Sequence, residues 1–68
     1  MEFDKILKIE LKAQKLSAYK LSKIKGISKV LISYYINGKS EPTITNLRKI
    51  CIALDVSADY LLGIKEYY

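Results

Sequence analysis

The fold is decided by residues 17–38, which read SAYKLSKIKGISKVLISYYING. A serine that can cap a helix opens this stretch, a second serine follows its central glycine, and an Asn-Gly pair closes it. These signals predict two helices of about two turns each, Ala18–Lys25 and Lys29–Ile36, joined by Gly26-Ile27-Ser28. The β-branched and aromatic residues of the second segment would also suit a strand, but the cap before it and the stop after it favour a helix.

Helix signals lie on both sides of this stretch. Before it, apolar residues at helical spacing predict a helix over about Glu2–Lys15. After it, a capping threonine precedes a predicted helix over Ile44–Leu54, and a capping serine precedes a short one over about 58–62. No segment reads convincingly as a strand. The sequence therefore predicts an all-α fold, a compact five-helix domain over residues 1–63 with a short tail at 64–68.

The spacing of the apolar residues also predicts which faces are buried. Four side chains can lock the two short helices at a fixed angle: Leu21, Ile27, Ile32 and Tyr35. The next helix carries one apolar face made of Ile44, Leu47, Ile50, Cys51 and Leu54. In the first helix, Glu10 falls in the middle of the apolar arc, where an unpaired carboxylate is costly. We therefore expect Glu10 to find a partner, either the Tyr35 hydroxyl or a lysine.

Positive charge is concentrated in the middle of the chain, whose net charge is +5. Residues 1–10 hold two lysines against three acids, and residues 41–68 hold three basic residues against four acids. Residues 11–40 hold seven lysines and no acid. Such a surface attracts a polyanion before any specific contact forms. Nucleic acid and an anionic membrane are both candidate partners, but the lysines span several helices rather than one amphipathic face, which argues against the membrane.

The composition excludes several kinds of chemistry. The chain has no histidine and one cysteine, Cys51, so zinc sites, histidine-based triads and an intrachain disulfide are excluded. It has no glycine-rich phosphate loop, no apolar run of membrane-spanning length and no signal peptide. We therefore expect a protein that is not an enzyme, with no cofactor, metal or small-molecule ligand, and with a cytoplasmic location. Cys51 is expected to be a small buried residue rather than a reactive thiol.

A series of short motifs runs along the chain in a fixed order. They are Leu16-Ser17 with Leu21-Ser22, Gly26-Ile27-Ser28, Ile32-Ser33, Asn37-Gly38-Lys39 with Pro42, Leu47-Arg48-Lys49-Ile50 with Ala53-Leu54, and Val56-Ser57-Ala58-Asp59-Tyr60-Leu61-Leu62-Gly63. In this order and at these spacings, the chain resembles the Cro and phage-repressor type of helix-turn-helix domain, also called lambda-repressor-like. The resemblance extends over about residues 7–63.

The resemblance implies a role for particular residues. In that family the second helix of the pair lies in the DNA major groove, and its N-terminal half contacts base edges. By position, the implied base-reading residues are Ser28, Lys29, Val30, Ser33 and Tyr34. The implied phosphate contacts are Ser17, Lys20, Asn37, Lys39 and Ser40. A lysine can donate to guanine, a serine can bond to several bases, and a valine offers apolar contact, best with a thymine methyl group.

The chain departs from the family pattern at several positions, three of which bear on packing and DNA contact. Many members pair an arginine of the first helix with a glutamate just before the Asn-Gly, and these positions are Leu11 and Ile36 here. Replacing an ion pair by packed apolar groups is often neutral or stabilising, so we expect Leu11 and Ile36 to contact each other. Many members also have a glutamine directly after the cap of the first helix of the pair. That position is Ala18 here, so one orienting contact to DNA is missing.

One such domain contacts only a few base pairs, so we expect a homodimer whose halves are about one DNA turn, roughly 34 Å, apart. The candidate dimer contact is made of Tyr60, Ile64, Tyr67 and Tyr68, unless this end of the chain is frayed, and a second candidate surface is Ile9 with Ala13. The sequence thus predicts a sequence-specific, repressor-like transcriptional regulator that binds a palindromic operator. The alternative is a protein-interaction module with the same fold, such as an antitoxin or an anti-repressor partner.

Overall fold

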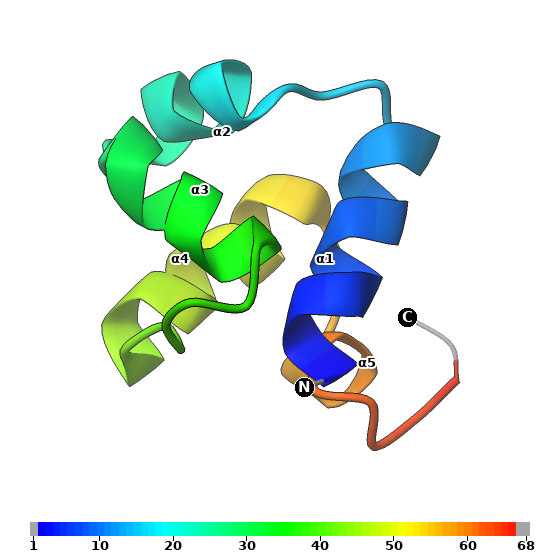
Figure 1. Ribbon diagram of the computed structural model, residues 1–68. Helices are drawn as coiled ribbons and strands as arrows, with labels where there is room; N and C mark the ends of the chain where they lie inside the picture. The colour runs from blue at the N-terminus through cyan, green and yellow to red at the C-terminus, as the bar shows by residue number, and fades with distance from the viewer. Residues whose placement is uncertain (1, 67–68) are drawn as a thin grey trace.

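The computed structural model describes residues 2–66, apart from the side chain of Lys25, and it folds into helices around one core (Figure 1). The helices are α1 (Glu2–Ala13), α2 (Ala18–Lys25), α3 (Lys29–Ile36), α4 (Ile44–Leu54) and α5 (Ala58–Leu61). No strand occurs among residues 2–66. The predicted all-α class is confirmed, as are the bounds of α2, α3 and α4. The first and last helices end earlier than predicted, at Ala13 and Leu61.

Four of the helices begin at the caps that the sequence predicts. The hydroxyl oxygens of Ser17, Ser28, Thr43 and Ser57 each accept a hydrogen bond of 3.1 Å from a backbone N–H two or three residues further on. These bonds satisfy N–H groups that have no partner within the first turn of a helix. Short polar residues therefore fix where α2, α3, α4 and α5 begin.

Two helices end on a left-handed residue that is not glycine. After α1, Lys15 has φ 57°, and after α4, Asp55 has φ 56°. At the end of α1, the N–H of Leu16 donates to the carbonyl of Leu11 at 2.9 Å, which closes the helix and turns the chain toward α2. This is why α1 ends before the predicted Lys15. A lysine in this conformation is strained because its Cβ crowds the backbone.

We expect Lys15→Gly to raise the free energy of unfolding by about 0.5 kcal/mol. Glycine adopts the left-handed conformation without the steric cost of a Cβ, and this gain exceeds the extra entropy that glycine adds to the unfolded chain. Urea unfolding followed by circular dichroism measures the change. The matched control, Lys12→Gly within α1, should lower stability by about 1 kcal/mol. Equal losses in both variants would contradict the strain at Lys15.

The core is built from all five helices and the turns between them. Its buried residues are Phe3, Leu7, Leu11, Leu21, Ile27, Ile32, Tyr35, Ile50, Leu54, Val56 and Leu61. All four side chains predicted to lock α2 against α3 are in this set. The prediction for Ile44 was wrong, since this residue is 86% exposed. Ile44 is the first residue of α4 and extends past the edge of the core, which helical spacing alone cannot show.

Glu10 is buried, and its partners differ from the predicted ones. The Tyr60 hydroxyl donates to Glu10 Oε1 at 3.0 Å, and Gln14 Nε2 donates to Glu10 Oε2 at 2.8 Å. Gln14 Nε2 also donates to the Leu54 carbonyl at 2.7 Å. The Tyr35 hydroxyl instead accepts from Asn46 at 3.0 Å, so the prediction of Tyr35 or a lysine was wrong. The network ties α1 to α5 and to the end of α4.

Removing the Tyr60 hydroxyl is expected to lower the free energy of unfolding by about 1–2 kcal/mol. Tyr60→Phe keeps the ring but removes one of the two hydrogen bonds to a buried carboxylate, and a buried polar group left without a partner is costly. Thermal and urea unfolding measure this change. As a control, Tyr19→Phe removes an exposed hydroxyl and should leave stability within about 0.5 kcal/mol of the original. A Tyr60→Phe variant as stable as this control would contradict the role of the bond.

Two further sequence predictions concern packing. Leu11 is buried and Ile36 is half-buried against the core, but a direct contact between them stays a prediction. Cys51 packs against the core but is half-buried, so the prediction of a buried residue holds only in part. Burial raises the pKa of the Cys51 thiol, because the charged thiolate loses its hydration. The thiol therefore stays protonated at neutral pH.

Candidate nucleic-acid interface

Helices α2 and α3 are joined by a turn of three residues, each of which has a defined structural role. Gly26 has φ 67°, and its N–H donates to the Ser22 carbonyl at 2.8 Å, which ends α2. The next residue, Ile27, is buried in the core. The buried Ile27 side chain anchors the turn to the core. Ser28, the next residue, caps α3, so α3 follows α2 after a short turn and at an angle to it (Figure 1).

One side of α3 is buried and the other is exposed. Ile32 and Tyr35 lie in the core, whereas Val30 is 59% exposed and Tyr34 is also exposed. Lys29, at the start of the helix, is exposed too. The structure therefore presents most of the predicted base-reading residues together on one outward face, with Ser28 exposed at the N-terminus of the helix.

Ser33 lies at the edge of this face. It is half-buried, and Asn37 Nδ2 donates to its carbonyl at 2.9 Å and to its Oγ at 3.4 Å. The Ser33 hydroxyl keeps its own proton, so it can still donate to a base. The Asn37 amide is occupied in ending α3, which leaves its oxygen rather than its N–H groups for other contacts.

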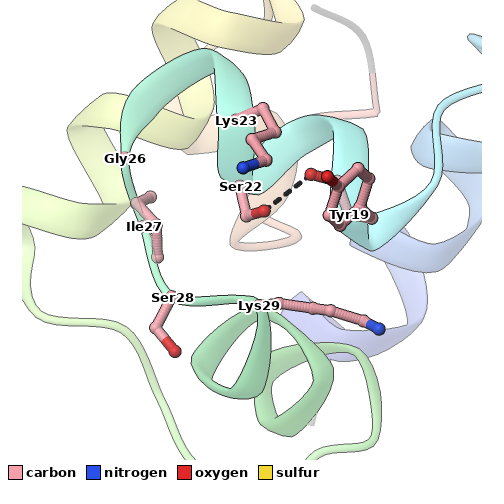
Figure 2. Close-up of a pocket in the computed structure, with 7 residues that line it drawn as sticks. All are labelled: Tyr19, Ser22, Lys23, Gly26, Ile27, Ser28 and Lys29. Atoms are coloured by element: carbon pink, nitrogen blue, oxygen red, sulfur yellow. Dashed lines mark hydrogen bonds between the residues drawn. The ribbon is translucent and has the colours of Figure 1, made fainter.

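A shallow hollow of about 430 Å³ lies between α2 and the start of α3. It is lined by Tyr19, Ser22, Lys23, Gly26, Ile27, Ser28 and Lys29. Figure 2 shows Tyr19 and Lys23 on the α2 side, and Ser28 and Lys29 on the α3 side. The Lys23 ammonium lies 5.3 Å from the centre of the Tyr19 ring, a cation–π distance. Two lysines therefore flank the hollow, and an anion that entered it would meet both.

The candidate phosphate contacts fall on both sides of the exposed α3 face. Ser17 and Lys20 are exposed at the N-terminus of α2, where the helix dipole favours an anion. The Ser17 oxygen accepts the capping bond, so its hydroxyl proton remains available to donate. After α3, Lys39 is exposed and Ser40 is half-buried. The Lys39 N–H donates to the Tyr34 carbonyl at 2.9 Å, which ties this loop to the end of α3.

Sequence reasoning missed Tyr19 as part of this site. The signal was present, because Tyr19 and Lys23 are four residues apart in a predicted helix and such pairs face each other.

Of the candidate dimer residues, Ile64 is exposed, whereas Tyr60 is half-buried and its hydroxyl is bonded to Glu10. Tyr60, which the sequence suggested as a dimer contact, therefore also packs against the core. Tyr67 and Tyr68 lie outside the described residues.

A family model described as helix-turn-helix matches residues 7–61, from α1 through α5. The chain belongs to the Cro/C1-type, lambda-repressor-like helix-turn-helix family. This confirms the resemblance found in the sequence. No curated protein and no solved structure matches the chain.

Membership in this helix-turn-helix family implies DNA binding and a role in transcriptional regulation, and such domains are generally not enzymes. Among the residues that the structure describes, no group of histidine, cysteine, aspartate and glutamate side chains is arranged to hold a metal ion. None of the described helices has both the length and the apolar composition needed to cross a bilayer.

Proposed function

We propose that this protein is a sequence-specific transcriptional repressor that inserts the segment from Ser28 to Ile36 into the major groove of double-stranded DNA. The observation that carries the proposal is the outward face of α3, which bears Lys29, Val30 and Tyr34 while the opposite side of the helix is locked in the core. The major groove is about 12 Å wide and admits one α-helix. A rigid helix that exposes one face can enter the groove without unfolding.

The side chains on this face can distinguish base pairs. Lys29 can donate to guanine O6 or N7, and the Ser28 and Ser33 hydroxyls can bond to several bases. Val30 can pack on a thymine methyl group, and Tyr34 can reach a base edge or a phosphate. The contacts to bases give sequence preference, whereas the contacts to phosphates fix the register of α3 in the groove.

Phosphate contacts at both ends of α3 would hold the domain on the duplex. On one side are Ser17 and Lys20, together with the free N–H groups at the start of α2. On the other side are Asn37, Lys39 and Ser40. The Asn37 amide is bonded within α3, so we expect its backbone neighbours and Lys39 to supply most of the interaction on that side.

The protein would act as a homodimer on a palindromic operator, because one domain covers too few base pairs for a selective site. The tail contact predicted from Tyr60, Ile64, Tyr67 and Tyr68 is part of this proposal. A cytoplasmic location is also part of the proposal, because a protein that binds DNA must be in the same compartment as its DNA. Repression follows if the dimer occupies a site that the transcription machinery needs.

A protein-interaction module is the second candidate, and the exposed apolar residues of α3 favour it. Val30 and Leu31 are both exposed and could bind an apolar partner. The lysines around α2 and α3, and the absence of acidic residues from 11–40, favour DNA instead. Selection of bound sequences from random double-stranded DNA distinguishes the two.

The selection should give a palindromic consensus whose half-sites are about 10 base pairs apart. Titrations of that site at several salt concentrations should then show affinity falling steeply, with a slope of about 0.9 per phosphate contacted in a plot of log affinity against log salt. A selection that enriches no sequence would overturn the proposal in favour of the protein-interaction module.

A further inference from the structure

Two residues of α2, Tyr19 and Lys23, line the hollow beside α3 but are not among the predicted DNA contacts. They are four residues apart, so their side chains lie on the same side of the helix, and both are exposed. The Lys23 ammonium lies 5.3 Å from the centre of the Tyr19 ring, which is within the range of a cation–π contact. A free lysine side chain has many rotamers, and this contact favours the ones that keep the ammonium beside the ring.

The donors that face the hollow come from both helices. The Ser22 hydroxyl is not one of them, because it donates to the Tyr19 carbonyl at 2.6 Å within α2 (Figure 2). The Ser28 oxygen accepts the capping bond of α3 at 3.1 Å, so its own proton remains available. With Lys23 on α2 and Lys29 on α3, the hollow has a donor on each of its two sides.

The hollow is positively charged. Lys23 and Lys29 both line it, and Figure 2 shows the Lys29 side chain extending from the start of α3 toward the side on which Tyr19 lies. None of the described residues that line the hollow is acidic, and residues 11–40 contain no acid. Two cations that face the same hollow repel each other unless an anion lies between them, so the hollow favours an anionic ligand.

The location of the hollow indicates which anion it takes. Ser28 and Lys29 line it and also belong to the outward face of α3. A duplex that receives α3 in its major groove therefore passes directly beside the hollow. Phosphate groups border the groove on both sides, and each has several acceptor oxygens, so one phosphate can accept bonds from two helices.

We propose that Lys23 and Lys29 bind one phosphate group of the DNA backbone in this hollow, and that Tyr19 is a positioning residue that holds the Lys23 ammonium there. The inference deepens the proposed function and rests on it, because DNA bound along α3 is what brings a phosphate to the hollow. A lysine ammonium has three donors, so Lys29 can contact this phosphate and a base edge together. The shared phosphate ties α2 to α3 through the ligand and fixes how deeply α3 enters the groove.

Replacing Lys23 by methionine tests the phosphate contact. Lys23→Met keeps an unbranched side chain but removes the charge, and it should weaken binding to the selected duplex by about 10-fold at physiological salt, as measured by fluorescence anisotropy. The slope of log affinity against log salt should fall by about 0.9, the value for one phosphate contact. The matched control, Lys65→Met, alters a lysine bound to Asp59 of α5 and should lower this slope by less than about 0.3. Equal changes in the two variants would overturn the proposal.

Variants of Tyr19 test whether the tyrosine acts through Lys23. Tyr19→Leu removes the aromatic face and should weaken DNA binding by about three-fold, whereas Tyr19→Phe keeps the ring and should bind as the original does. In the Lys23→Met background, Tyr19→Leu should have no further effect. No loss in Tyr19→Leu, or a loss that is as large in the absence of Lys23, would overturn the positioning role. An equal loss in Tyr19→Phe would assign the effect to the hydroxyl and overturn it as well.

Duplexes in which one backbone phosphate at a time is replaced by an uncharged methylphosphonate locate the contact. At one position in each half-site, the replacement should weaken binding of the original chain by about 10-fold and leave binding of Lys23→Met unchanged. At that position Lys29→Met should lose less affinity than the original chain does, since Lys29 shares the phosphate. A set of duplexes in which no position distinguishes Lys23→Met from the original would contradict the proposal.

Inorganic phosphate distinguishes the duplex from a free anion as the source of the bound group. It should displace the duplex no better than chloride does at the same ionic strength, because one phosphate outside a duplex lacks all the other contacts. Saturable binding of inorganic phosphate in the hollow, with the affinity for DNA unchanged, would show that the site serves a free anion and would overturn the proposal.

The hollow and the proposed function can fail separately. Phosphates carry no sequence information, so the variants of Tyr19 and Lys23 can be compared on any duplex even if the selection enriches nothing. If the selection succeeds and these variants bind the consensus as the original chain does, the hollow has no role and the sequence-specific function stands.

Discussion

Replacing Ile36 by glutamate is expected to lower the free energy of unfolding by about 3 kcal/mol. Ile36 ends α3 and packs half-buried against the core, to which the buried Leu11 also belongs. A single charge introduced among apolar groups loses hydration and gains no partner. The loss should be visible as a shift of the urea and thermal transitions with no change in the unfolding mechanism.

A second substitution tests whether Leu11 and Ile36 contact each other. Adding Leu11→Arg to Ile36→Glu recreates the ion pair that many members of the family have at these positions. If the two side chains touch, the double variant should recover at least half of the stability lost in Ile36→Glu, and a double-mutant cycle should show a favourable interaction. Losses that simply add would mean that the residues are not in contact.

The control for this experiment is Ile44→Glu. Ile44 is also an isoleucine at the end of a helix, but it is 86% exposed, so its replacement should change stability by no more than about 0.5 kcal/mol. An Ile36→Glu variant as stable as Ile44→Glu would show that Ile36 does not need its apolar surroundings.

Lys29→Glu is expected to weaken binding to the selected DNA site by about 100-fold. Lys29 is exposed at the start of α3 and lines the hollow beside Lys23, so a carboxylate there removes a contact and repels the nearby phosphates. Fluorescence anisotropy with a labelled duplex, repeated at several salt concentrations, measures the effect. The dependence of affinity on salt should also become less steep.

The matched control changes the net charge equally at a distance from α2 and α3. Lys65→Glu alters a lysine that is bound to Asp59 of α5, so affinity for DNA should fall by no more than about three-fold. If both variants weaken binding equally, the lysines act only through the overall charge and Lys29 has no particular place in the interface. Unchanged circular dichroism in both variants would show that the fold is kept.

The site was predicted from the sequence to the extent that it depends on local signals. The caps at Ser17 and Ser28 and the glycine at 26 determine where α2 ends and α3 begins, because each acts within three or four residues. Once α3 has its predicted bounds, the burial of Ile32 and Tyr35 turns its other side outward. The positions of the candidate DNA-contacting residues in the fold therefore followed from the sequence, and their contacts with DNA are proposals.

Other features required the packing of segments far apart in the chain. The sequence showed that Glu10 needed a partner but not that Tyr60, fifty residues away, would supply it. It placed Ile44 on an apolar face but could not show that the core ends before this residue is reached. It also offered Ile9 and Ile64 as separate candidates for a dimer contact, but it could not show that α1 packs against α5.

The sequence by itself determined the five helices, the bounds of α2, α3 and α4, and the concentration of lysines around α2 and α3, because capping, helical periodicity and local charge are properties of neighbouring residues. The tertiary structure alone decided which buried polar groups pair and which apolar residues stay in contact with water. Those outcomes depend on distances between helices, and no local pattern along the chain encodes such distances.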